Sequence, residues 1–401
     1  MRRLTHIIAL ALILLLSGCR KEDFTQVELR IRLEIPTGST VKIDLSKVSL
    51  RLQSKTFNLS YMLEVSSEGE ATAKVQPGKY DLLASYYDSA TRIAANGSAS
   101  EFLLTGSGIV ADDGSIGEAI VRIPLNIAVP SSLIIRELYF HGSYTLEGAT
   151  YQKDRYIELY NNAGPGGETV YLDSLCIAGL YPYNSTTGSN AWAGLDTLAL
   201  GQMFWCFPGN GHSYPLAPGE SCVIAAWAAV DHSQRCTTGL HLEKSHFGCY
   251  ADHLSKFHEI AAGVTPMICY MAGQGTGWSL SNNSPAFVLF KPDMGVAAYR
   301  AHPETWERFE PGKSSGTRYW HIAKNWIIDA VECVDKPEGA VKRLPASVDA
   351  SYVWMRSPHY SGKCVTRALD YVSEGIEVFK DTNNSENDWI PDSPLSPRLK
   401  N

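Results

Sequence analysis

The stretch Tyr156–Gly179, YIELYNNAGPGGETVYLDSLCIAG, decides how this chain folds. Tyr156–Tyr160 is a β-prone run, and the apolar pattern resumes over Val170–Ile177. Between the two lies Asn161–Gly167, which holds three glycines and a proline, residue types that favour turns. We therefore expect two adjacent strands in a hairpin-like arrangement, as at the start of a β-sandwich.

The same β character extends in both directions from this stretch. Residues 27–35 alternate apolar residues with charged ones, which predicts a strand with one buried and one wet face. After Pro130 short apolar runs are separated by long loops, notably 179–214 and 228–281. We predict an all-β protein with one sandwich over residues 27–130 and a larger sandwich with long insertions over residues 131–401.

The composition and charge of the chain restrict the classes of function that we expect. The chain has 401 residues, of which 44% are hydrophobic and 19% charged, and its formal net charge is −7. This charge argues against a nucleic-acid partner, because phosphate binding needs a concentrated Lys and Arg surface. All nine Trp, and all Cys and His beyond residue 19, lie after Ser132. We therefore expect any specific function in the second domain.

The N-terminus predicts export and a lipid anchor. Arg2 and Arg3 precede the apolar run Ile7–Leu16, which is too short to span a bilayer. Leu16-Ser17-Gly18-Cys19 resembles the bacterial lipobox, in which the signal peptide, here residues 1–18, is cut before the cysteine. Cys19 would then carry fatty chains such as palmitate, and residues 19–26 would form a tether. The alternative is a plain secretory signal.

The charged residues after Cys19 bear on location. Lys21-Glu22-Asp23 resembles the export signal of Bacteroidota-type lipoproteins displayed on the outer surface. We therefore expect an outer-membrane lipoprotein that faces the cell exterior. The periplasmic face of the same membrane is the alternative.

Six stretches carry family resemblances. The phrase Val75–Leu82, with its Pro-Gly turn, resembles immunoglobulin-like and transthyretin-like modules, which usually act as spacers. Tyr156–Leu175, Leu216–Ala225 and Trp326–Glu332 resemble the strands of a lamin-tail domain, an immunoglobulin-like sandwich. Lys380–Trp389, together with Arg136–Gln152, resembles the lipoprotein family catalogued as domain of unknown function 4876. That resemblance implies a cell-surface lipoprotein whose relatives often accompany TonB-dependent outer-membrane transporters, and it implies no known chemistry.

The cysteines after the anchor are candidates for disulfides. Their even number in an exported protein favours pairing of most of them, with a connectivity that the sequence leaves open. No C-x-x-C motif occurs, which argues against zinc-knuckle and thioredoxin-like sites. The candidates are Cys176, Cys206, Cys222, Cys236, Cys249, Cys269, Cys333 and Cys364.

A histidine-rich insertion is the candidate metal site. Imidazole is a common ligand of transition metals, and nearby acidic residues and cysteines would add to it. The spacing of these histidines matches neither H-E-x-x-H nor a zinc finger, so exposed or capping histidines are the alternative reading. The candidates are His232, His241, His246, His253 and His258.

Aromatic residues in one glycine-rich loop are the candidate ligand-binding site. Exposed aromatic side chains mark protein or carbohydrate interfaces, whereas buried ones would fill a small core under the loop. The candidates are Tyr181, Tyr183, Trp192, Trp205 and Tyr214.

The sequence contains no H-E-x-x-H motif, and we expect no enzymatic activity. We expect a non-enzymatic binding or accessory module that needs no cofactor and acts alongside a TonB-dependent transporter. An adhesive or structural envelope protein is one alternative, and a metal-capturing lipoprotein is another.

Overall fold

The computed structural model describes residues 26–128, 131–186, 190–271, 278 and 280–401. These residues form two compact units. The first comprises residues 26–34, Ile43–Leu82 and Ala99–Ile123, and the second comprises Ile35–Lys42, Leu83–Ser98 and the described residues from Pro124 to Asn401. The sequence predicted two continuous domains, whereas these units are discontinuous because two long strands contribute residues to both. The predicted signal peptide and Cys19 lie outside the described residues.

The strands between residues 27 and 128 form two β-sheets. One sheet has the strand order β4-β1-β9, and the other has the order β3-β2-β5-β6-β7-β8 with β10 paired to β6. The strands are β1 (Val27–Glu34), β2 (Ser49–Ser54), β3 (Ser60–Leu63), β4 (Glu70–Val75), β5 (Gly78–Asp88), β6 (Ile93–Thr105), β7 (Gly108–Val110), β8 (Ile116–Gly117), β9 (Ile120–Pro124) and β10 (Asn126–Ala128), with the 3-10 turn η1 (Leu45–Lys47) between β1 and β2.

The alternation in β1 is confirmed. Leu29, Ile31 and Leu33 are buried, while Glu28 and the other charged residues between them point to solvent. Such alternation lets one face of a sheet pack while the other stays hydrated.

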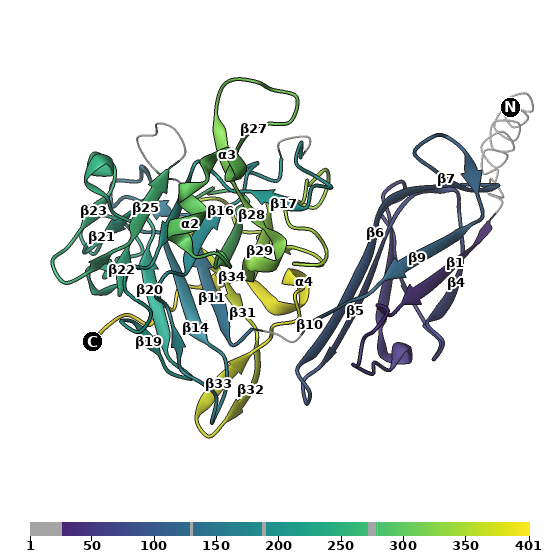
Figure 1. Ribbon diagram of the computed structural model, residues 1–401, viewed down its shortest axis with the longest axis horizontal. Coiled ribbons are helices and arrows are strands. Elements are labelled where there is room, and N and C mark those ends of the chain that lie inside the picture. Colours follow the sequence, from purple (N-terminus) through teal and green to yellow (C-terminus); the bar gives the residue numbers. More distant parts are fainter. Residues whose placement is uncertain (1–25, 129–130, 187–189, 272–277, 279) are drawn as a thin grey trace, which may run out of the picture. The chain divides into compact units, whose positions relative to one another are not determined.

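The second unit is built on two larger sheets. One has the order β24-β22-β20-β14-β11-β31-β34, and the other has the order β25-β18-β16-β26-β29-β30. Strands β11, β14, β20 and β31 lie side by side in the first of them (Figure 1). The strands are β11 (Leu133–Tyr139), β14 (Tyr156–Asn161), β16 (Cys176–Gly179), β18 (Met203–Cys206), β20 (Ser221–Ala225), β22 (Phe247–Gly248), β24 (Thr265–Pro266), β25 (Ile268–Met271), β26 (Ala286–Phe290), β29 (Ile327–Val334), β30 (Val353–Trp354), β31 (Lys363–Arg367) and β34 (Trp389–Pro394).

Smaller elements cover these sheets. They are the pairs β12 (Ser143–Tyr144) with β13 (Thr150–Tyr151), β15 (Val170–Tyr171) with β19 (Pro215–Leu216), β21 (Ala228–Ala229) with β23 (Glu259–Ile260) and β32 (Leu369–Ser373) with β33 (Ile376–Phe379), and the sheet β17 (Thr197–Ala199), β28 (Arg318–Ala323) and β27 (Glu307–Phe309). The helices are α2 (Val296–Ala301), α3 (Pro303–Trp306) and α4 (Ser385–Asp388), with 3-10 turns η2 (Leu242–Lys244), η3 (Asp252–Leu254) and η4 (Lys324–Trp326). The predicted all-β class is therefore confirmed.

The main core lies between the two larger sheets. Ile157 and Ile224 from one sheet belong to the same buried cluster as Trp205, Leu289 and Val331 from the other. The outer faces are covered as well, because Val288 packs with Tyr299 of α2 and Val223 packs with Leu242 of η2. Because both faces of these sheets are covered, every residue of β14 and β26 is buried.

The hairpin-like arrangement expected within Tyr156–Gly179 is wrong. Strand β14 pairs with β11 and β20 in one sheet, whereas β16 pairs with β18 and β26 in the other. The turn-forming residues between them therefore carry the chain from one sheet to the other. Short β15 lies on this path and pairs with β19.

A buried ion cluster fixes the closing segment of the chain. Arg367, at the end of β31, has a side chain that is 1% exposed and pairs with Asp329 (2.5 Å), Asp381 (3.2 Å) and Asp388 (3.4 Å). Its Nε also donates to the carbonyl of Ile135 on β11. The segment after Lys380 is thus held to the sandwich by charge as well as by its own hydrogen bonds.

We predict that Arg367→Ala lowers the free energy of unfolding of the second unit by about 3–5 kcal/mol, because it leaves buried carboxylates without their cation. Arg235→Ala is the matched control, since Arg235 forms a half-exposed pair with Glu259 at 2.8 Å that should contribute no more than about 1 kcal/mol. Urea unfolding followed by Trp fluorescence measures this unit, since all nine Trp lie after Ser132. Equal losses in the two variants would contradict the assignment.

Candidate functional site

Four aromatic side chains gather beside the loop that the sequence singled out. The ring of Tyr181 stacks on Tyr319 with centroids 4.1 Å apart, and Tyr183 meets Tyr181 edge-on at 5.3 Å. Trp192 packs edge-on against Tyr319 at 6.0 Å. We call Tyr181, Tyr183, Trp192 and Tyr319 the aromatic cluster. Three of its four members were predicted, and the fourth comes from β28, more than a hundred residues further along the chain.

Within this cluster Tyr183 is the exposed member. It is 39% exposed, whereas Trp192 is 4% exposed and Tyr319 is 8% exposed. Its ring lies against Gly201, where an added Cβ would come within 2.8 Å of Tyr183 Cε1. Its hydroxyl accepts a hydrogen bond from the backbone N–H of Gln202. The protein therefore holds an aromatic ring in a fixed position at its surface.

The other two aromatic candidates pack in or against the main core. Trp205 is fully buried on β18, between the two main sheets. Tyr214 is half-buried and packs against Phe247 with ring centroids 5.0 Å apart. Trp205 is therefore unavailable to a ligand and its predicted binding role is wrong, whereas that of Tyr214 stays a prediction.

The histidine candidates divide by burial, and they do not form one metal site. His232 is fully buried, with one ring nitrogen 2.9 Å from the Tyr151 hydroxyl and the other 3.0 Å from the Ala228 carbonyl. His246 is half-buried, and its Nδ1 accepts from the backbone N–H of Val223. Both imidazole rings therefore form hydrogen bonds within the fold. Burial lowers the pKa of both, which keeps them neutral.

His258 is the most fully engaged of the five. Its Nδ1 donates to the Cys249 carbonyl at 2.6 Å, and its Nε2 accepts from Trp227 Nε1 and from the backbone of Trp278. Burial lowers its pKa to about 4. His253 is exposed in η3. That leaves His241, which lies at the surface beside two carboxylates.

The expectation that most of the eight cysteines are paired is not met. Cys176 and Cys206 lie opposite each other on β16 and β18 and form a disulfide. The remaining candidates are free thiols on or beside buried strands, because their register places other residue types opposite them, as with Leu159 opposite Cys222. These free cysteines are Cys222, Cys236, Cys249, Cys269, Cys333 and Cys364.

Five of these six free thiols are poorly suited to nucleophilic chemistry. Burial raises the pKa of Cys222, Cys249, Cys333 and Cys364, and it raises the pKa of Cys269 to about 12. The thiolate, which is the reactive form, is therefore disfavoured at neutral pH.

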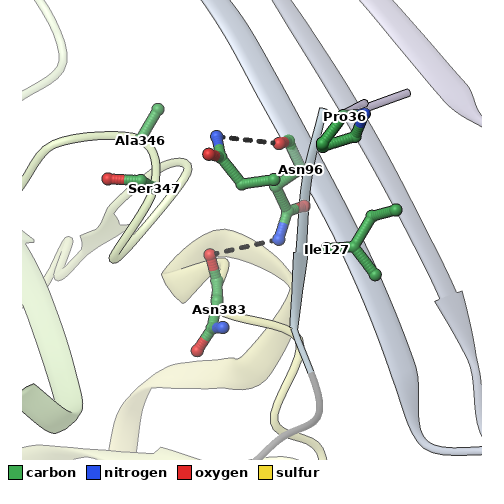
Figure 2. A pocket seen from close by; sticks show the side chains of 7 residues that line it. Pro36, Asn96, Ile127, Ala346, Ser347 and Asn383 are labelled. Carbon is green, nitrogen blue, oxygen red and sulfur yellow. Dashed lines mark hydrogen bonds between the residues drawn. The ribbon is translucent and has the colours of Figure 1, made fainter. Parts of the chain in front are cut away.

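A small hollow in the second unit is polar. Its volume is about 320 Å³, and Asn96, Asn126 and Asn383 contribute to its lining (Figure 2). The amide of Asn96 donates to the Thr382 carbonyl at 2.5 Å, and Asn126 donates to the Asn96 carbonyl. These amides hold neighbouring segments together, so we assign no ligand to the hollow.

Comparison with known proteins finds a likeness to one family. Residues 217–396 match the model of a family described as protein of unknown function, DUF4876. The crystal structure of a DUF4876 family protein from Bacteroides thetaiotaomicron superposes with a TM-score of 0.60 at 26% sequence identity, covering 93% of this chain and 96% of that chain. No curated protein matches. The resemblance to this family predicted from the sequence is therefore confirmed. Among the described residues, no helix is long and apolar enough to cross a membrane.

The pKa of His258 gives a pH prediction. The ordinary histidine pKa is near 6.5, so below that pH the unfolded chain binds a proton that buried His258 does not take up until about pH 4. Neutral His258 therefore makes its full contribution to the free energy of unfolding above pH 6.5, and this contribution is lost as the pH falls. We predict that between pH 7 and pH 5 the unfolding free energy drops by about 1–2 kcal/mol less in His258→Asn than in the wild type.

Urea unfolding at the two pH values measures this difference. His302→Asn is the control for the loss of a histidine, because that side chain is 60% exposed and lies at the surface beside Glu304. A drop in His258→Asn as large as in the wild type would show that His258 is not the titrating group.

Proposed function

We propose that this protein is a lipoprotein of the outer membrane that faces the cell exterior and acts there as a binding module rather than as an enzyme. The sequence Leu16-Ser17-Gly18-Cys19 supports the anchor, because acyl chains on Cys19 would supply membrane affinity of about 0.8 kcal/mol per buried CH₂. The charged residues that follow Cys19 support the exposed face of the membrane.

The observation that carries the binding role is the aromatic cluster. Tyr183 presents a large, amphipathic ring whose position is fixed by Gly201 and Tyr181, so little conformational entropy is lost when a partner covers it. Rigid aromatic residues of this kind dominate the energy of many protein interfaces.

The chemistry of the buried groups supports binding over catalysis. His232 and His258 use their ring nitrogens in hydrogen bonds inside the fold, and burial raises the pKa of the Cys222 and Cys333 thiols. A general base or a nucleophile needs a reachable group with a pKa close to the working pH. The resemblance of this chain to a family whose members often accompany TonB-dependent transporters favours such a transporter as the partner.

The anchor is tested by Cys19→Ala, which we predict moves the protein from the membrane fraction to the soluble fraction. Without the thiol no acyl chain can be attached. Cell fractionation followed by immunoblotting measures the distribution, and Cys269→Ala, which removes a half-buried thiol of the second unit, should stay in the membrane fraction. Unchanged membrane association of Cys19→Ala would refute the lipid anchor.

The binding role is tested by cross-linking on intact cells. We predict that an outer-membrane transporter cross-links to the wild type and that Tyr183→Ala reduces its recovery by about tenfold, the loss expected when a central aromatic contact is removed. Tyr171→Ala is the matched control, because Tyr171 has the same exposure of 39% and lies outside the aromatic cluster. Mass spectrometry identifies and quantifies the cross-linked protein.

Two outcomes would overturn this role. One is equal recovery of the transporter in the two tyrosine variants, which would place the contact elsewhere. The other is recovery of host or matrix material in place of a transporter, which would favour an adhesin.

A further inference from the structure

Three potential metal ligands converge at the surface of the second unit. Among the described residues, Asp231, His241 and Glu243 form the one group of His, Cys, Asp or Glu residues whose ligand atoms all lie within 4.8 Å of one another. His241 Nδ1 is 3.5 Å from Asp231 Oδ1 and 3.1 Å from Glu243 Oε1. Two segments of the chain supply the group, since Asp231 follows β21 and the other two flank the start of η2.

The backbone holds these side chains in place. Asp231 and His241 form an isolated antiparallel bridge, and the neighbouring His232 N–H donates to the Leu240 carbonyl at 2.9 Å. Leu242, between the two ligands of η2, is fully buried and fixes the turn. The positions of the three ligands are therefore set by the fold, which reduces the cost of ordering them around an ion.

The charges of the group are not balanced by the protein. Among the ion pairs of the described residues, neither Asp231 nor Glu243 has a Lys or Arg partner within 4.0 Å. Glu243 Oε2 is shielded from solvent and accepts no hydrogen bond. A shielded carboxylate oxygen without a donor is unfavourable, and a bound cation would satisfy it.

We propose that Asp231, His241 and Glu243 bind a divalent transition-metal ion of the Zn²⁺ type. In a tetrahedral site with metal–ligand distances of about 2.0–2.2 Å, neighbouring ligand atoms lie about 3.3–3.6 Å apart, close to the separations from His241 Nδ1. One imidazole with two carboxylates suits such an ion, whereas Ca²⁺ prefers six to eight oxygen ligands. Three protein ligands leave a further position for water. This site is independent of the lipid anchor and of the aromatic cluster.

The test is a titration of the detergent-solubilised full chain, stripped with a chelator, with Zn²⁺ in an isothermal calorimeter. We expect one bound ion per chain in the wild type and affinity weakened by more than about tenfold in His241→Ala and in Glu243→Gln. His302→Ala is the matched control, because His302 is also exposed and lies 2.9 Å from a single carboxylate, that of Glu304. This variant should bind as the wild type does.

Each other result would overturn the proposal. Absence of binding by the wild type, or unchanged affinity in both ligand variants, would show that the group is an ordinary surface ion pair. An equal loss in His302→Ala would indicate nonspecific binding by exposed histidines. Tighter binding of Ca²⁺ than of Zn²⁺ in a parallel titration would exclude the assigned class of metal. Circular dichroism of each variant confirms that the fold is retained.

Discussion

The second unit depends on one buried guanidinium. Arg367 is charged at every physiological pH, and the fold can bury it only because Asp329, Asp381 and Asp388 surround it. Burial raises the pKa of Asp329, whereas the Arg367 guanidinium lowers it, so the cation favours a charged form that burial disfavours. Asp329 lies on β29 of one main sheet and Arg367 on β31 of the other, so the ion pair joins the two sheets.

This constraint accounts for a part of the chain that hydropathy alone leaves unexplained. The polar run Asp381–Ser385 is buried, because Asp388 accepts hydrogen bonds from the backbone of Thr382 and Asn384 and also meets Arg367. The sequence favours a turn here, because Asp, Thr, Asn and Ser side chains hydrogen-bond their own backbone. It did not indicate that the turn would be internal, since its partner lies in a different strand and is not marked by spacing.

The sequence predicted the fold class and the positions of many strands, because burial periodicity is local information. Alternation identified β1, and the apolar run identified β14. Pairing between strands is not local, so the transition from β14 to β16 was mistaken for a hairpin, although the two strands belong to different sheets. The even number of cysteines misled for the same reason, since only Cys176 and Cys206 lie opposite each other.

For the candidate sites too, local sequence indicated the region, whereas contacts between distant parts of the chain decide which residues are available. The sequence indicated the insertion that holds His241 but gave no reason to prefer it over His258, because the two differ in burial and not in residue type. Folding decides which polar groups remain available. A ring nitrogen that bonds a buried carbonyl, as in His258, is used in stabilising the core, and withdrawing it for a ligand would leave that carbonyl without a partner. At the surface water can replace such a partner, so His241 and Tyr183 can exchange their contacts for those of a ligand at low cost. The two proposed binding sites therefore lie in the insertions, where the fold holds side chains in position and leaves them accessible to a ligand.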